Sequence, residues 1–422
     1  MSAEPARAGG AAAPRLSPAM SWALAVGATL TMAVSYFDRQ TLASIAPSVT
    51  ADLGIDGAGY GLLVSAFSIA YLVGSPISGA LVDRFGPRRA LLVAVVVWTI
   101  VAALHSLAAS FVMLFVLRIA LGLTESPTFP GATATVTRAL SPADRPRGFG
   151  LLFTGSSLGA LLAPLAATKL DALYGWQVAF LVTAVAGLSW IPMWLLLTRG
   201  AAARRALDPI VVKVGVPAGG SIGRTAVHPA VLRAVVVVLA TAPLASFVLN
   251  WSAKYLAEVE GIHKADIGAY LWLAPVLFDV GSLGFGHLAT QHAKRFDSPP
   301  RVLFTVCGLL ALALPLCLVF RGPWPLAVFA GVALAGVAGL FAIFTADMLV
   351  RVPLDSVSKA GGITAAAQSL AYIVASPLIG RSVDATGGYS AAIVVLSAIV
   401  APGVVAWLLW KPPPPAVEPA AG

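Results

Sequence analysis

Long apolar segments dominate this chain and rule out a soluble fold. Hydrophobic residues make up 59% of the 422 positions, charged residues only 11%, and the mean hydropathy is +0.89. About 20 apolar residues form a helix that crosses the roughly 30 Å hydrocarbon core of a membrane. Twelve such segments are found, at 20–47, 57–82, 89–109, 112–138, 147–169, 177–198, 228–257, 266–291, 301–320, 324–349, 360–381 and 388–410. We therefore predict an all-α membrane protein with twelve transmembrane helices.

Basic residues predict the orientation of these helices. If both termini are cytoplasmic, 20 of the 27 Lys and Arg residues lie on the cytoplasmic side, six lie on the other side, and Arg118 falls within a span. Cytoplasmic loops carry such an excess of Lys and Arg. We expect a multi-pass protein of a bacterial cytoplasmic membrane with both termini inside. The net charge of +9 then reflects topology, and no nucleic-acid partner is expected.

A polar segment at 199–224 divides the spans into two sets of six. Each set opens with a long predicted helix and a similar turn, at 53–60 and 261–270. Duplicated six-helix halves are typical of secondary transporters, which bind substrate between the halves. We predict these domains: a disordered cytoplasmic tail at 1–19, six-helix bundles at 20–198 and 227–411, a cytoplasmic linker at 199–226, and a Pro-rich cytoplasmic tail at 412–422.

Other functional classes are disfavoured. The sequence lacks a G-x-x-x-x-G-K-[ST] run, which excludes an ATP-driven pump within this chain. The G-x-S-x-G match at 155–159 lies in a predicted membrane helix, without the strand–turn–helix context of a hydrolase, so we expect no enzyme. His287 and His292 do not share a helix face, and no cysteine or acid cluster completes a metal site. Cys307 and Cys317 are predicted on one helix, about 15 Å apart, too far for a disulfide.

The loop between the second and third spans carries a recognisable pattern. Its sequence, G-A-L-V-D-R-F-G-P-R-R, contains glycines, an acid and arginines at fixed spacing. This pattern resembles the signature loop of the major facilitator superfamily. The resemblance implies a gating role for Gly79, Asp83, Arg84, Gly86, Arg88 and Arg89. In the corresponding loop of the second half, Thr290 or Gln291 stands where an acid is usual, so we expect weaker gating contacts there.

Further stretches resemble the anion:cation symporter branch of that superfamily. They are Y-F-D-R-Q-T-L-A in the first span, 118–131 and 155–164. Segments 250–256, 278–286 and 346–353 look closest to bacterial hexuronate and related sugar-acid transporters. The resemblance implies that Asp38 and Glu125 are proton sites and that Arg39 binds the substrate carboxylate. A guanidinium offers a carboxylate two parallel hydrogen bonds, which suits that role.

Charged residues inside spans are costly and tend to face a cavity or a partner. Arg118 and Glu125 are two helical turns apart, so both project from one face toward a network that includes Asp38. The alternative is an ion pair that only holds helices together. Pro127 and Pro130 interrupt the helix directly after Glu125, and broken helices at membrane depth usually line a cavity. That favours a functional Glu125.

The second half offers two charged candidates. Lys254 is either a second cation for the substrate or a side chain that extends to the membrane surface. Asp279 accepts sugar hydroxyls, pairs with Lys254, or caps a helix break at Gly281. Arg381 and Asp384 are expected to shape a helix end. The groups expected to recognise hydroxyls are Tyr36, Ser156, Asn250, Tyr255, Thr364 and Gln368.

Together these features predict proton-coupled uptake of an organic anion by alternating access. The expected substrate is a sugar acid such as a hexuronate or aldonate, carried by a monomer in contact with membrane lipid. No cofactor is expected beyond the proton gradient, and sodium coupling stays open. A small or aromatic monocarboxylate is an alternative, since Trp251, Trp272 and Phe278 suit a ring. A drug/proton antiporter shares the fold, but should lack an arginine beside the first-span acid.

Overall fold

The computed structural model describes residues 16–141, 144–208, 222–293, 295–296, 298–353, 356–411 and 413–414. Most of both predicted tails and residues 209–221 of the predicted linker lie outside this part of the chain. The side chain of Asp83, a predicted gating residue, is also outside it.

Twelve helical spans in the described chain confirm the predicted all-α membrane fold. The first six are formed by α1 (Pro18–Ser44), α3 (Gly57–Phe85), α4 (Pro87–Leu104), α5 and α6 (Phe111–Glu125 and Thr128–Ala139), α7 (Arg145–Tyr174), and α8 and α9 (Trp176–Gly187 and Trp190–Thr198). The second six are formed by α12 (Pro229–Glu258), α13 and α14 (Lys264–Leu271 and Leu273–Ala293), α15 and α16 (Arg301–Ala311 and Leu316–Val319), α17 (Pro323–Arg351), α18 (Val357–Thr386) and α19 (Ser390–Leu409). The short connecting helices are α2 (Ala46–Asp52), η1 (His105–Leu107), α10 (Ala201–Leu207) and α11 (Ile222–Ala226).

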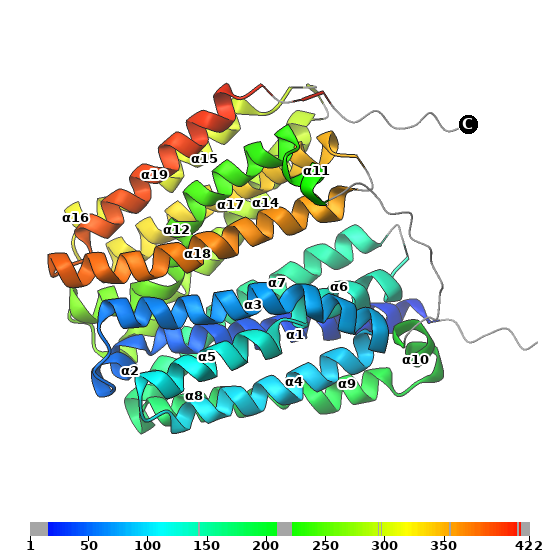
Figure 1. Cartoon of the computed structure of the whole chain (residues 1–422), viewed down its shortest axis with the longest axis horizontal. Coiled ribbons are helices and arrows are strands. Elements are labelled where there is room, and N and C mark those ends of the chain that lie inside the picture. Colours follow the sequence, from blue (N-terminus) through cyan, green and yellow to red (C-terminus); the bar gives the residue numbers. More distant parts are fainter. Residues whose placement is uncertain are drawn as a thin grey trace, which may run out of the picture.

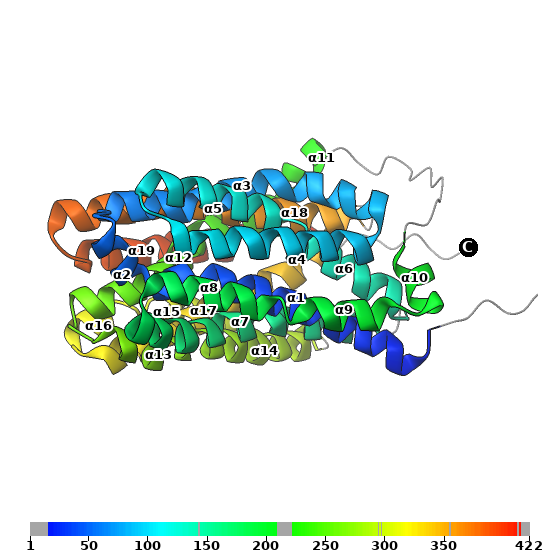
Figure 2. The same cartoon turned by 90° about the horizontal axis from the view of Figure 1, so that it is seen from below.

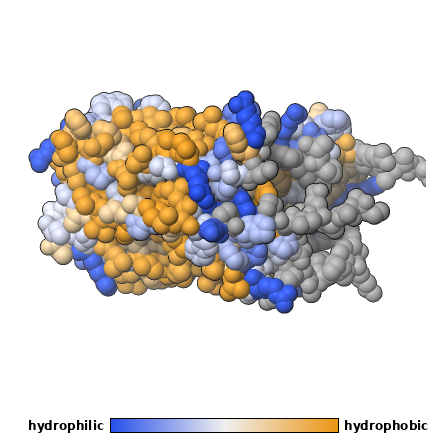
Figure 3. All heavy atoms as spheres, turned by 90° about the horizontal axis from the view of Figure 1, so that it is seen from above, coloured by the Kyte–Doolittle hydropathy of each residue, from blue (hydrophilic) through white to orange (hydrophobic). Residues whose placement is uncertain are grey.

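The two sets of six helices form two bundles that lie side by side (Figures 1 and 2). The first helix, α1, begins at the same end of the molecule at which the last helix, α19, ends. We call this the terminal end and the opposite one the distal end. Apolar side chains cover much of the outer face in Figure 3. Such a surface is stable against lipid rather than water, so the chain is a multi-pass membrane protein.

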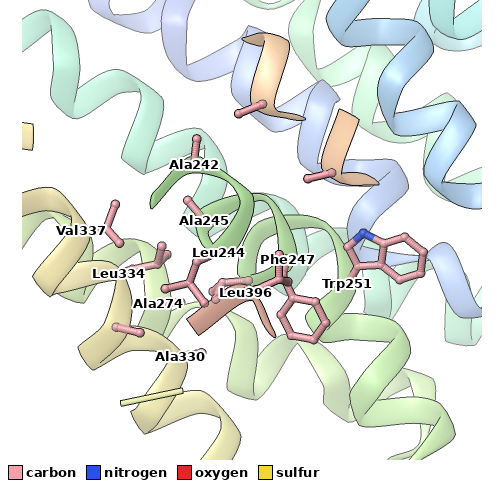
Figure 4. Packing of buried hydrophobic residues seen from close by; sticks show 14 of the residues in the cluster. Ala242, Leu244, Ala245, Phe247, Trp251, Ala274, Ala330, Leu334, Val337 and Leu396 are labelled. Atoms are coloured by element: carbon pink, nitrogen blue, oxygen red, sulfur yellow. The ribbon is translucent and has the colours of Figure 1, made fainter. Parts of the chain in front are cut away.

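The second bundle is built around α12. Its residues Leu244 and Phe247 are fully buried. They lie near Leu334 of α17 and Leu396 of α19 in the apolar core shown in Figure 4. Cys307 and Cys317 are buried and free, as predicted, and lie in one span, Arg301–Val319. The helix of that span is interrupted between them, so Cys307 lies on α15 and Cys317 on α16.

The bundles touch through glycines at the distal end. A Cβ atom on Gly380 of α18 would lie 2.0 Å from the Gly57 carbonyl oxygen of α3, and one on Gly61 would lie 2.3 Å from the Ser376 carbonyl oxygen. A Cβ on Gly268 of α13 would meet the Pro164 carbonyl oxygen of α7 at 2.4 Å. The helices therefore pack backbone to backbone, which only glycine allows.

The facing glycines of the same spans, α3 with α18 and α7 with α13–α14, make no such close contact at the terminal end. Cβ atoms added to Gly79 of α3 and to Gly361 and Gly362 of α18 would have no described atom within 4 Å, and the same holds for Gly150 of α7 and Gly284 of α14. The ribbons of the two bundles also diverge toward this end (Figure 1). This conformation is closed at the distal end and open at the terminal end.

The predicted gating loop is docked within the first bundle. Gly86 has a φ of +79°, and its Cβ would lie 2.4 Å from the Leu207 carbonyl oxygen of α10. Arg88 donates to both carboxylate oxygens of Asp208, at 2.7 and 3.0 Å. Trp194 donates its ring N–H to the Arg88 carbonyl oxygen at 3.0 Å. In this conformation Arg88 therefore holds the start of the linker, whereas Arg84 and Arg89 are exposed.

Candidate functional site

An ion pair between α1 and α5 lies at the centre of the predicted site. Arg39 donates its Nε–H to Glu125 Oε2 at 2.6 Å, and the Ser35 hydroxyl donates to the same oxygen at 2.8 Å. The Glu125 side chain is fully buried, whereas that of Arg39 is 16% exposed. Of the two, Arg39 is the member that an incoming ligand can reach.

Aromatic rings hold the Arg39 guanidinium in place. Its central carbon lies 4.9 Å from the ring centres of Tyr36 and Phe67, and 4.4 Å from that of Tyr71. Such cation–π contacts stabilise a cation while leaving its N–H groups available. Tyr71 was not among the predicted residues. Its position four residues after Phe67, on the same face of α3, was the available signal.

Arg118 also contacts Phe67, with its central carbon 4.8 Å from the ring centre. It is only 5% exposed, and its Nε and Nη1 atoms find no hydrogen-bond partner among the described residues; nor does Glu125 Oε1. Arg118 and Glu125 are thus both buried on α5, as their spacing predicted. Glu125, however, takes Arg39 as its partner.

Asp38 does not pair with its neighbour Arg39. It is 4% exposed, and neither carboxylate oxygen has a hydrogen-bond partner in the described chain. The carboxylate interacts electrostatically with Glu125 and lies close to the indole N–H of Trp98 on α4. Burying an ionised carboxylate without donors is costly, so this position suits a group that also exists in a neutral form.

The helix break after Glu125 is present, as Pro127 and Pro130 predicted. Helix α5 ends at Glu125, and α6 begins at Thr128 with Pro127 at its N-cap position. The Ser126 hydroxyl lies 2.5 Å from that of Ser78 on α3, so the break is tied to a neighbouring helix. The helix end that carries Glu125 is therefore held by α1, through Arg39, and by α3, through Ser78.

The second bundle contributes polar groups opposite Arg39. Gln368 of α18 donates its amide to the Tyr372 hydroxyl at 3.4 Å, and Tyr372 lies close enough to Tyr36 to interact electrostatically. Asn250 of α12 accepts the Tyr60 hydroxyl on its backbone carbonyl at 2.6 Å, while its side chain donates to its own helix. Tyr372 was missed, although it shares a helix face with Gln368. Thr364 also bonds its own helix, through the Gly361 carbonyl.

Asp279 of α14 joins the bundles at mid-depth. Its Oδ1 accepts the hydroxyl of Ser157, the neighbour of the predicted Ser156, at 2.6 Å. Two of the predicted alternatives for Asp279 were wrong. Helix α14 runs unbroken through Gly281, which is glycine because a Cβ would lie 2.3 Å from the Ala335 carbonyl oxygen. The pairing with Lys254 is also absent, because Lys254 has other partners.

Lys254 lies at the distal end, where it helps to close the bundles. Its Nζ is 2.6 Å from Glu258 Oε1 and donates to the Thr50 hydroxyl of α2 at 2.9 Å. Neither predicted position, beside a substrate or at the membrane surface, describes this buried contact.

Two aromatic candidates, Tyr255 and Trp251, are buried away from the site. Tyr255 is 3% exposed, with its ring 5.5 Å from that of Tyr389, so its predicted role in hydroxyl recognition is not supported. Trp251 is fully buried against Tyr60 and does not line a site for an aromatic substrate.

Comparisons with known proteins agree with this architecture. Residues 28–347 match the Major Facilitator Superfamily. The chain is 26% identical to a hexuronate transporter of Bacillus subtilis, over 85% of this chain and 87% of the relative. It is 25% identical to a probable sulfoacetate transporter of Cupriavidus necator, over 90% and 91% of the two chains. A crystal structure of a bacterial homologue of the human lysosomal transporter Spinster, inward-facing and unoccupied, shares the fold with a TM-score of 0.78 at 16% identity, covering 93% and 97% of the two chains.

Proposed function

The chain belongs to the major facilitator superfamily and is a transporter rather than an enzyme, and from this premise we propose that it imports a sugar acid together with protons. The observation that carries the proposal is the position of Arg39. Its guanidinium is fixed by three aromatic rings, is partly exposed, and already binds one carboxylate, that of Glu125. A substrate carboxylate would take the same donors.

Competition for Arg39 would couple the substrate to a proton. A hydrogen bond between charged groups contributes roughly 1.5 to 3 kcal/mol, about twice a neutral one. Protonation of Glu125 weakens its bond to Arg39, which releases the guanidinium for the substrate. Loss of that proton favours the internal ion pair and expels the substrate.

The charges of the cluster support the same coupling. Asp38, Arg39, Arg118 and Glu125 sum to zero when both acids are ionised. A bound monocarboxylate adds one negative charge in a region where uncompensated charge is costly. One proton on either acid restores neutrality, so we expect one proton per singly charged substrate.

The terminal end would be the cytoplasmic one, because most Lys and Arg residues belong to its loops. This structure would then be the inward-open state. Cysteine labelling tests the orientation: Gly215→Cys should react only with reagent added from the cytoplasmic side, and Ile262→Cys only from the outside. The reverse pattern contradicts the proposed topology.

Transport is tested with purified protein in liposomes. Labelled galacturonate or galactonate should accumulate when the outside is made acidic, and a protonophore should abolish accumulation. Accumulation driven by a sodium gradient at equal pH would contradict proton coupling but not sugar-acid transport. Accumulation of benzoate or lactate in place of the sugar acids would favour the alternative substrate class.

A further inference from the structure

The relatives leave open how many charges the substrate carries. A hexuronate carries one negative charge, whereas sulfoacetate carries a carboxylate and a sulfonate. The binding residues in this chain bear on that choice. We infer that the site selects sugar acids with a single negative charge and rejects those with an anionic group at both ends; this inference rests on the proposed function.

Arg39 supplies the positive charge of the site. Two other residues, Arg118 and Lys254, were candidates for a second cation, but neither lies open to the site. Arg118 lies 4.8 Å from the centre of the Phe67 ring and is only 5% exposed, so little of it is open to a ligand. Lys254 is buried at the distal end and is neutralised by Glu258 at 2.6 Å. An anion held by Arg39 therefore meets neither of these charges with its other end.

The opposite wall of the site instead carries an acid. A small cavity between the bundles is lined by Gln40 of α1, Pro164 of α7 and Pro275 of α14. Neither Arg39 nor Asp279 lines this cavity, but Arg39 directly precedes Gln40 on α1 and Asp279 follows Pro275 by one turn on α14. Because α1 runs away from the terminal end and α14 runs toward it, both residues lie on the cavity's terminal side.

Contacts of α7 place Asp279 at the depth of the Arg39 cluster. Ser157 donates to Asp279 at 2.6 Å. Two residues later in α7, a Cβ on Gly159 would lie 2.8 Å from the Cβ of Tyr36, whose ring contacts Arg39. A cation on one bundle and an acid on the other thus flank the space between them at similar depth.

This arrangement fits one end of a sugar acid and repels a second charged end. The Asp279 carboxylate already accepts one hydroxyl, that of Ser157, and a substrate hydroxyl has the same chemistry. A second substrate carboxylate would be repelled by Asp279 and would meet neither Arg118 nor Lys254. Placing a like charge against the wrong ligand is an effective source of specificity.

Galactonate and galactarate test this directly, because they share a six-carbon chain and the same four secondary hydroxyls. They differ at one end, which is an alcohol in galactonate and a carboxylate in galactarate. Calorimetric titration of the purified full-length protein at neutral pH should give a galactonate affinity at least tenfold higher than that for galactarate. Asp279→Asn, which keeps the size of the side chain and removes its charge, should reduce this ratio at least fivefold.

Ser157→Ala is the matched control, because it removes the hydrogen-bond partner of Asp279 but keeps the charge. It should retain the tenfold preference. If the wild type binds both ligands equally, charge selection is wrong while sugar-acid transport stands. If Asp279→Asn keeps the full preference, Asp279 is not the selecting residue and the inference is overturned. If neither sugar acid binds, the proposed function itself fails.

Discussion

The carboxylate of Asp384, near the end of α18, caps the first turn of α3 in the other bundle. Its two oxygens accept the backbone N–H groups of Gly57 and Ala58 at 2.9 and 2.8 Å. The first N–H groups of a helix have no partner within the helix, and an anion there also interacts favourably with the helix dipole. One bundle therefore satisfies the helix end of the other only while the distal end is closed.

Removing this cap should open the distal end. A capping side chain is worth about 1 kcal/mol, and up to about 2. Asp384→Ala should therefore raise the population open at the distal end several-fold. The reporter is Ser252→Cys, which lines the cavity between the bundles, in a background that lacks Cys307 and Cys317. Its labelling by a maleimide added from the distal side should accelerate several-fold.

Asp56→Ala provides the control for that experiment. Asp56 caps the same helix from within its own bundle, by accepting the Gly59 N–H at 2.7 Å. Its loss should weaken α3 similarly without favouring either conformation. Equal labelling rates in the Asp384→Ala variant and its parent would show that the cap does not hold the distal end closed.

Glycine substitutions should also shift the equilibrium between the closed and the open distal end. Gly380→Ala would place a methyl group 2.0 Å from the Gly57 carbonyl oxygen, so the closed distal end cannot form without displacement of α3 or α18. We expect faster distal labelling at Ser252→Cys and slower transport. Gly362→Ala, on the same helix, meets no described atom within 4 Å and should not accelerate labelling. The same rate in both variants would contradict the close packing at Gly380.

Asp347, one of the few acids within a span, has a structural partner. Arg233 is almost fully buried and donates to Asp347 Oδ2 at 2.6 Å and to the Trp407 carbonyl oxygen at 3.0 and 2.8 Å. Arg351 binds the other carboxylate oxygen at 2.9 Å. This network joins α12, α17 and α19 at the terminal end of the second bundle.

Arg233→Met should therefore destabilise the protein by about 3 to 5 kcal/mol, as expected when one partner of a buried ion pair is removed. Thermal unfolding in detergent measures this loss. Asp347→Asn should cost less in the Arg233→Met background than in the wild type, because the 2.6 Å pair with Arg233 is already broken. Strictly additive losses in the double variant would mean that the two residues are not energetically coupled.

Much of the fold was predictable because its determinants are local. Apolar length located all twelve spans, and Pro127 located the break after Glu125. Contacts between distant residues were not predictable. Gly57 and Asp384 are 327 positions apart, so the sequence indicated a helix end at Asp384 but not the helix that it caps.

The site was only partly predictable for the same reason. Helical spacing placed Arg118 and Glu125 on one face, but the partner of Glu125 depends on how α1 packs against α5. From the sequence, Lys254 could either bind substrate or extend to the membrane surface. Only the structure shows that it instead contacts Thr50 and Glu258 at the distal end. Tyr71 and Tyr372 carry no charge that would mark them in a membrane span.

Arg39→Ala should abolish sugar-acid binding. The substrate carboxylate would lose charge-assisted hydrogen bonds worth roughly 1.5 to 3 kcal/mol each, which is a weakening of at least tenfold. Calorimetric titration with galactonate measures this. Lys169→Ala removes an exposed cation of α7 and should leave the affinity unchanged. Wild-type affinity in the Arg39→Ala protein would remove Arg39 from the binding site.

The most direct test of proton coupling is transport by Glu125→Gln in liposomes. Glutamine keeps the shape of a protonated glutamate but cannot release a proton, so this variant should exchange labelled for unlabelled substrate at a rate close to that of the wild type. It should fail to concentrate substrate when a pH gradient is imposed. Accumulation equal to that of the wild type would contradict the account, and the Arg39–Glu125 pair would then only hold α1 and α5 together.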